Sequence, residues 1–180
     1  MATSEQALQV TKDVYKHFIE RDCPTLLNNS CVAGGAIRDA IYNKEIKDID
    51  IFVPIKEFSH PNMESLGSQL GRLNLKLVAD PNYKDNNTMV YELSGFDLPV
   101  QIILKKDCYD YADVVRNFPA SVSRCYFHPQ ENKVVTLNSF NATKYTGKVF
   151  CTNDIKPEYL DRLKAKYKEM SFYNKTGGRI

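Results

Sequence analysis

The sequence predicts an α+β protein in which a small mixed or antiparallel sheet carries helices on one side. Two observations predict this class: amphipathic helical patterns occur near both ends of the chain, and several short segments with strand character lie between them. A third observation is that no internal repeat or low-complexity segment interrupts them. With 180 residues, of which 43% are hydrophobic and 26% charged, the chain fits one globular domain with a helical appendage.

The first expected element is an amphipathic helix over about residues 4 to 21. Thr3 and Gln6 form a capping-box pattern at its start, and Cys23-Pro24 ends it. Residues 31–33, Cys-Val-Ala, then form a candidate for a short buried strand.

Two glycines, Gly34 and Gly35, follow this strand and precede an expected helix over residues 36–42. After that helix, Lys47 to Val53 alternates polar and apolar residues before Pro54, which is typical of a strand. A polar loop is expected over residues 80–87. The remaining expected elements are helices over residues 63–73, 110–117 and 157–170, and strands over residues 75–79, 88–94, 98–104, 123–127 and 133–137.

Asp48 and Asp50 are the first candidate site residues. Residues i and i+2 of a strand project from the same face, so both carboxylates can converge on one site. Such a pair suits Mg²⁺ (or Mn²⁺), because Mg²⁺ is usually held by one or two carboxylates together with substrate phosphates and water. Alone the pattern is weak, since acidic pairs at the rim of a sheet are commonly just solvated.

The Gly34-Gly35 pair is the second candidate feature. Glycines between a strand and a helix allow a phosphate chain to approach the backbone, and the start of the helix presents free N–H groups. Arg38 adds a charged donor for the same phosphates. A lone Gly-Gly pair is usually a plain turn, but its position shortly before the acidic pair predicts a phosphate-binding turn that faces a metal site.

Together the two motifs resemble a known signature. Gly34-Gly35-Ala36-Ile37-Arg38-Asp39, followed by Asp48-Ile49-Asp50, is similar to the head domain of CCA-adding tRNA nucleotidyltransferases and bacterial poly(A) polymerases. These enzymes belong to the DNA polymerase beta-like nucleotidyltransferase superfamily, so the resemblance implies that fold over about residues 25 to 150. It also implies that Asp48 and Asp50 are catalytic metal ligands, and that Gly34, Gly35, Arg38 and Asp39 bind the nucleotide. Asp39 has an alternative role, which is to orient Arg38 by pairing with it.

A second segment, Asp113 to Phe118, is similar to the family's Arg-Arg-Asp-Phe motif, and the resemblance assigns Arg116 and Asn117 to the ribose and triphosphate. The match is loose, because one cation and one carboxylate of the motif are replaced here. Many superfamily members also carry a third carboxylate on a later strand, where this chain has Gln101. Asp97 could compensate only if its turn folds inward.

The end of the chain is expected to be a separate appendage, which divides the molecule into residues 1–155 and a basic helix and tail over residues 156–180. The tail has seven basic and three acidic residues, so it carries +4 whereas the whole chain carries +2. A basic face can bind RNA, although charge alone favours a solvated helix face. The family's neck and body domains, which select the base and grip tRNA, are not expected here.

We expect the protein to be cytoplasmic. Five widely spaced cysteines, an odd number without a C-x-x-C pair, predict reduced thiols, and no signal peptide or membrane-spanning segment is expected.

These patterns predict a minimal nucleotidyltransferase that transfers a nucleoside monophosphate from an NTP, ATP among the candidates, to a hydroxyl by two-metal catalysis. The acceptor favoured by the resemblance is an RNA 3′ end, as in tRNA. The alternatives are a protein or small-molecule acceptor, as in toxin-type or regulatory enzymes, and a catalytically inactive protein that binds a nucleotide or a partner. Whether a homo-oligomer completes the site stays open.

Overall fold

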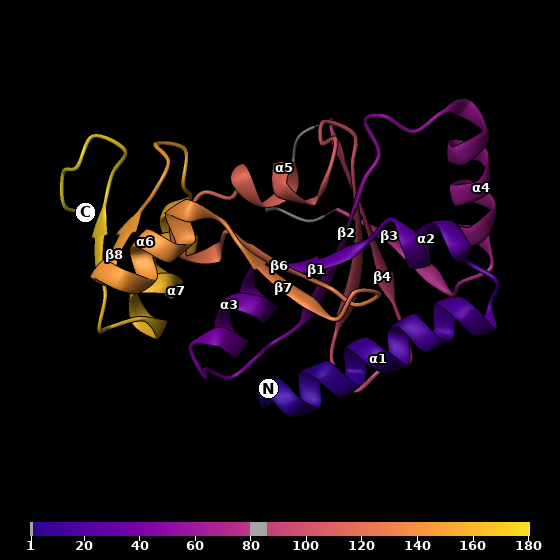
Figure 1. The fold of residues 1–180 in the computed structure, drawn as a ribbon, viewed down its shortest axis with the longest axis horizontal. Helices are drawn as coiled ribbons and strands as arrows, with labels where there is room; N and C mark the ends of the chain where they lie inside the picture. Colours follow the sequence, from indigo (N-terminus) through magenta and orange to yellow (C-terminus); the bar gives the residue numbers. More distant parts are fainter. Residues whose placement is uncertain (1, 80–85) are drawn as a thin grey trace.

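A seven-stranded sheet runs through the middle of the computed structural model, which describes residues 2–79 and 86–180 (Figure 1). The strands lie in the order β3-β4-β5-β2-β1-β6-β7. β2 and β5 are parallel, and the other neighbours in this sheet are antiparallel. The strands are β1 (Cys31–Ala33), β2 (Ile49–Pro54), β3 (Leu75–Val78), β4 (Thr88–Leu93), β5 (Val100–Lys105), β6 (Cys125–His128) and β7 (Lys133–Thr136).

One face of the sheet is covered by α1 (Ser4–Glu20), α2 (Pro24–Asn28), α3 (Gly35–Ile41) and α4 (His60–Gly71). Alternation along β2 points Ile49, Ile51 and Val53 into this layer, where they are buried with Val14 and Phe18 of α1. The expected capping box is confirmed: Thr3 and Gln6 bond to each other's backbone N–H groups, which fixes the start of α1.

The opposite face carries a smaller core beneath the short helix α5 (Tyr111–Arg116). Phe52 and Ile103 from the central strands are buried there with Val114 and Val115 of α5. Figure 1 shows α1 and α5 on opposite sides of the strands. The α+β class with a mixed sheet is therefore confirmed, and α5 is a short helix added to the second face.

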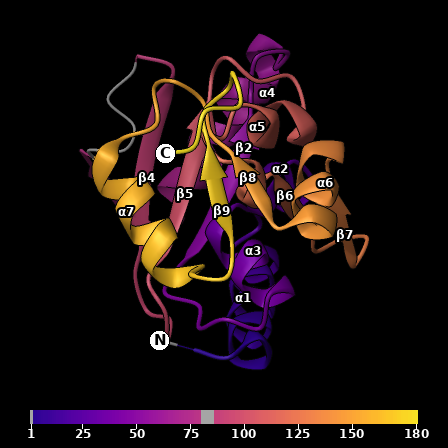
Figure 2. The ribbon, with the colours of Figure 1, turned by 90° about the vertical axis from the view of Figure 1, so that its left-hand side faces the viewer.

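A third core lies at one end of the molecule and contains both η1 (Ser121–Ser123) and the last elements of the chain. β8 (Lys148–Phe150) pairs in parallel with β9 (Ser171–Tyr173), beside α6 (Asn138–Thr146) and α7 (Pro157–Lys166). Figure 2 looks onto this end, with α7 and β9 in front. The boundary at residue 155 stays a prediction; β8 and β9 lie on either side of it and share one core.

Several elements differ from those expected. α2, α6, β8 and β9 have no counterpart among the sequence predictions, and the loop expected over residues 80–87 falls mostly outside the described residues. β2 begins at Ile49 rather than Lys47, so Asp48 lies immediately before the strand.

The end of α7 is the difference that matters most for the site. The helix was expected to continue to Met170 but ends at Lys166, because Tyr167 leaves helical geometry with φ −113° and ψ 59°. Its ring is then fully buried against Tyr42, at 5.4 Å between ring centroids. The helix therefore ends at the point where the side chain of Tyr167 enters the core.

No helix in the described part of the chain combines the length and the apolar content needed to cross a bilayer. All five cysteines lie among the described residues, where each is buried and has a free thiol.

Candidate functional site

The turn after β1 is built around Gly34. This residue has φ +75° and ψ −127°, a backbone conformation that side chains with a Cβ rarely adopt. A Cβ added there would also lie 3.1 Å from the ring of Phe118. The Gly34 N–H donates to the carbonyl of Cys125 at 3.1 Å, so the turn is held against β6.

Strand pairing brings the acidic pair beside this turn. In the antiparallel β1–β2 pair, Cys31 lies opposite Phe52 and Val32 opposite Ile51. Continuing the same register by one residue puts Ala33 opposite Asp50, and the turn at Gly34 follows Ala33 directly at this end of β2. The structure therefore places the predicted phosphate-binding turn and the predicted metal ligands at one edge of the sheet.

The two aspartates have different surroundings. Asp50 alternates with the buried Ile49 and Ile51, so its side chain lies on the face that also carries Phe52. Burial raises the pKa of the Asp48 carboxyl, Lys47 opposes that effect, and the nearby charge of Asp39 adds to it. A bound cation would stabilise the ionised form of such a carboxylate.

The donor set fits a divalent ion held jointly with a substrate. Among the described residues, no group of three acidic, histidine or cysteine side chains is placed to bind a metal. Two carboxylates are sufficient for Mg²⁺ when phosphates and water complete its six ligands. Asp48 and Asp50 would be the ligands that the protein contributes.

The adjacent strand supplies an amide instead of a further charge. Gln101 of β5 lies beside Asp50, and Glu92 of β4 lies beside Gln101. Glu92 is exposed, and among the described residues it forms no metal-binding group of three with the two aspartates. Asp97 lies exposed between β4 and β5.

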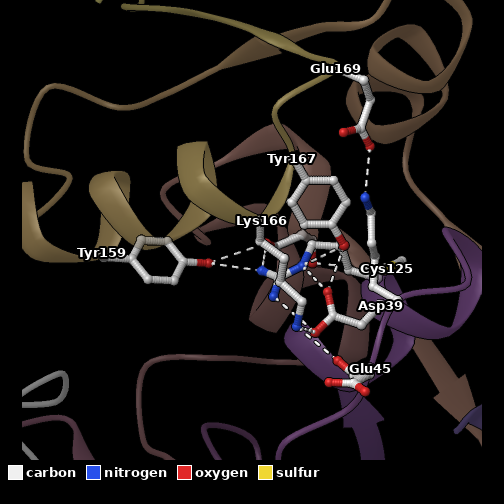
Figure 3. A network of polar contacts seen from close by, with 10 residues as sticks. Asp39, Glu45, Cys125, Tyr159, Lys166, Tyr167 and Glu169 are labelled. Carbon is white, nitrogen blue, oxygen red and sulfur yellow. Dashed lines mark hydrogen bonds and ion pairs between the residues drawn. The ribbon is translucent and has the colours of Figure 1, made fainter.

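Arg38 and Asp39 lie next to the turn in a buried polar network. Figure 3 shows Asp39 in this network with Lys166 and Tyr167. The Arg38 Nε donates to Asp39 Oδ1 at 2.8 Å, and its Nη1 donates to Ser123 Oγ at 2.9 Å. Arg38 is only 7% exposed. Its charge is thus close to the turn, while its N–H groups already have protein partners. The pairing role of Asp39 is present in the structure, and nucleotide contact by either residue stays a prediction.

Arg116 and Asn117 lie at the exposed end of α5. Arg116 pairs with Asp113, and the Asn117 side chain donates to the Asp113 carbonyl at 2.9 Å. The next residue, Phe118, packs on Phe52 with ring centroids 5.5 Å apart and also faces Gly34. The end of α5 therefore lies next to the glycine turn, on the same face of the sheet as Asp50.

A family model for "Gad2: Gabija anti-defense 2 family protein" matches residues 5–143, most of the chain. The chain belongs to this family. Comparison with curated proteins gives no match.

Some solved structures are similar to this family member. A CCA-adding enzyme with CTP is 18% identical, with a TM-score of 0.47, over 76% of this chain and 36% of that chain. The Thermotoga maritima CCA-adding enzyme complexed with tRNA is 17% identical, with a TM-score of 0.46, over 67% of this chain and 28% of that chain. This chain spans about a third of the length of these proteins.

Sequence reasoning missed the partners that hold Arg38 in place. Ser123, Tyr159 and Tyr167 all bond to its guanidinium, and the last of these is 129 residues away in the sequence. Lys166 is one of the seven basic residues of the tail, and it bonds to Asp39. No local pattern marks these residues, because their role depends on how distant segments pack.

Proposed function

We propose that this protein is a metal-dependent nucleotidyltransferase that transfers a nucleoside monophosphate from an NTP to a hydroxyl and releases pyrophosphate. The observation that carries the proposal is the placement of the Gly34-Gly35 turn beside Asp48 and Asp50, with the charge of Arg38 behind it. A turn without side chains, a cation and two acidic ligands are what a metal-bound triphosphate needs.

Each group has a separate task in this proposal. The turn allows the triphosphate to approach the backbone. The positive charge of Arg38, on the protein side of the turn, attracts the triphosphate. Asp48 and Asp50 hold the divalent ion, which when bound neutralises phosphate charge and activates the acceptor hydroxyl. Arg116 reaches the sugar or the phosphates from the end of α5. The rate enhancement comes from positioning and charge stabilisation.

The family favours an acceptor other than tRNA. Because its members are described as Gabija anti-defense proteins, we propose that the modified hydroxyl belongs to a component of the Gabija defence, a protein or a small molecule. Acting on such a component would be an anti-defence activity.

The test is a transfer reaction with each of four α-labelled NTPs, in Mg²⁺ or Mn²⁺, with purified Gabija proteins and total RNA as acceptors. We expect label in a Gabija component, and none when the variant Asp48→Asn/Asp50→Asn replaces the unchanged protein. Transfer that persists in this double variant would overturn the metal assignment.

An RNA 3′ end is the second candidate acceptor, favoured by exposed lysines in the tail. Label in RNA would select it. Lys164, Lys168 and Lys175 are the exposed cations to neutralise in a binding assay, because Lys166 already bonds to Asp39. RNA affinity that falls steeply with salt, and falls further in the triple variant, would support this acceptor.

A protein that binds nucleotides without turnover is the third candidate, favoured by Gln101 beside Asp50. Calorimetric binding of an NTP with no transfer to any acceptor would select it over both enzymatic candidates.

A further inference from the structure

The network behind the glycine turn is completed by residues from the end of the chain. Tyr167 is fully buried, and its hydroxyl lies between the two charged partners. It donates to Asp39 Oδ1 at 2.5 Å and accepts from Arg38 Nε at 3.2 Å. Burial raises the pKa of Tyr167, so its hydroxyl keeps the proton that it donates.

Lys166 binds the other oxygen of the same carboxylate. Its Nζ donates to Asp39 Oδ2 at 2.5 Å and to the backbone carbonyl of Glu45 at 2.8 Å (Figure 3). The Asp39 carboxylate is thus held by Arg38 and by two consecutive residues of the C-terminal segment. Through its bond to Glu45, Lys166 also holds the loop that connects α3 to Asp48.

The second side of Arg38 is fixed by the same segment. Its Nη1 donates to the Tyr159 hydroxyl of α7 at 3.3 Å, and that hydroxyl lies 3.2 Å from Ser123 Oγ. A Cβ at Gly35 would lie 3.3 Å from Arg38 Nη2. The guanidinium therefore rests against the turn in a position that α3, η1 and the C-terminal segment set together.

The charges of the network also indicate that Lys166 contributes to the site. Asp39 neutralises Arg38, and Lys166 restores one net positive charge to these three residues behind the turn. Without Lys166 the three-residue group would lose that charge, and a polyanion in front of the turn would be attracted less strongly.

We propose that Lys166 and Tyr167 are positioning residues that set Arg38 and the Gly34-Gly35 turn for the triphosphate. This inference rests on the proposed function. It makes the C-terminal segment a part of the nucleotide site, although neither residue touches the nucleotide itself.

The experiment measures calorimetric binding of inorganic tripolyphosphate and of an NMP, both with Mg²⁺, to the full chain. The affinity for tripolyphosphate measures phosphate binding at the turn alone, so the preferred base does not have to be known. We expect Tyr167→Phe and Lys166→Met each to weaken tripolyphosphate binding about tenfold, with a smaller loss for the NMP. Lys166→Arg should recover part of the affinity, because it keeps the charge.

Two control variants separate positioning from stability. Lys144→Met removes an exposed charge of α6 at the same end of the molecule and should leave binding unchanged. Val149→Ala opens a hole in the C-terminal core, so it should lower the melting temperature without changing tripolyphosphate affinity below the transition.

The outcomes distinguish the two proposals. If the unchanged protein binds neither tripolyphosphate nor any NTP, the proposed function fails and this inference fails with it. If the unchanged protein binds but Tyr167→Phe and Lys166→Met bind equally well, the inference alone is overturned. An equal loss in Val149→Ala would also overturn it, since stability would then explain the effect.

Discussion

At the scale of single residues, the two glycines after β1 are required for different reasons. Gly34 has a positive φ of +75° and faces the ring of Phe118. Gly35 has an ordinary φ but leaves room for the Arg38 guanidinium, which a Cβ would approach to 3.3 Å. The structure of the turn therefore favours glycine at both positions, independently of the proposed phosphate binding.

We predict that Gly34→Ala lowers the free energy of unfolding by about 1–3 kcal/mol, because alanine is strained at this φ and its Cβ crowds Phe118. Urea denaturation measures the change. The matched control is Gly67→Ala in α4, where an added Cβ meets nothing within 4 Å and should stabilise the helix by about 0.5–1 kcal/mol. Equal effects of the two substitutions would contradict the role of φ.

Asp39 provides a prediction for pH. Burial alone would raise the pKa of its carboxyl, but the bonds and charge of Arg38, with further bonds from Lys166 and Tyr167, hold the pKa below its ordinary value of 3.8. Because the pKa of Asp39 is lower in the folded state than in the unfolded state, its carboxylate stabilises the fold at pH values above the unfolded-state pKa. That stability is lost as the pH falls through the folded-state value.

We therefore expect Asp39→Asn to cost about 3 kcal/mol at pH 7, because it leaves Arg38 buried without its counter-ion. The difference from the unchanged protein should shrink as the pH falls below about 4, because the unfolded chain binds the proton first, and it should be lost as the pH passes the lower folded-state pKa of Asp39. Urea denaturation at both pH values measures it, with the exposed Asp161→Asn as the control. A difference that stays constant with pH would contradict the electrostatic explanation.

At the scale of elements, local patterns predict α1 well and α7 only in part. The start of α1 depends on Thr3 and Gln6, which are neighbours in the sequence, so a capping box is visible there. The end of α7 depends on Tyr167 bonding to Asp39, 128 residues away, so the periodicity of the helix cannot reveal it. β8 and β9 were missed for the same reason, because each has three residues and needs the other as its partner.

The same distinction applies to the candidate site. The closeness of Gly34, Gly35, Asp48 and Asp50 could be predicted because strand, turn and strand follow closely in the sequence, whereas their roles stay a prediction. Their proximity follows from the β1–β2 register. The environment of Arg38 could not be predicted, since its partners Ser123, Tyr159 and Tyr167 come from distant segments.

We predict that Thr3→Ala lowers the free energy of unfolding by about 1 kcal/mol, because the N–H of Gln6 loses its acceptor at the start of α1. Ser65→Ala, an exposed position inside α4, serves as the control and should not destabilise the protein. Urea denaturation compares the two variants, and a similar loss in both would argue against capping as the cause.

At the scale of the whole molecule, the third core joins the end of the chain to its middle. Leu163, Tyr167 and Phe172 are buried there with Val122 and Val149. A chain that ends at residue 155 would expose this core. We expect such a truncated protein to lose roughly 5 kcal/mol from the three missing side chains, a large part of a typical domain's stability.

The measurement is denaturant unfolding of the truncated chain beside the full one. We expect a lower midpoint or no cooperative transition. A truncated chain with the same midpoint and the same transition would instead support residues 156–180 as an independent appendage.

The bond between Arg38 and Tyr167 also has a consequence for protein synthesis. A ribosome adds about 5–20 residues per second, and 129 residues separate these two partners. Arg38 therefore waits roughly 6 to 26 seconds for the hydroxyl that holds it. During that interval Asp39 and Ser123 can already bond to the guanidinium, but Tyr159 and Tyr167 are not yet available. Under the proposed function, the complete nucleotide site would therefore form only after residue 167 has been added.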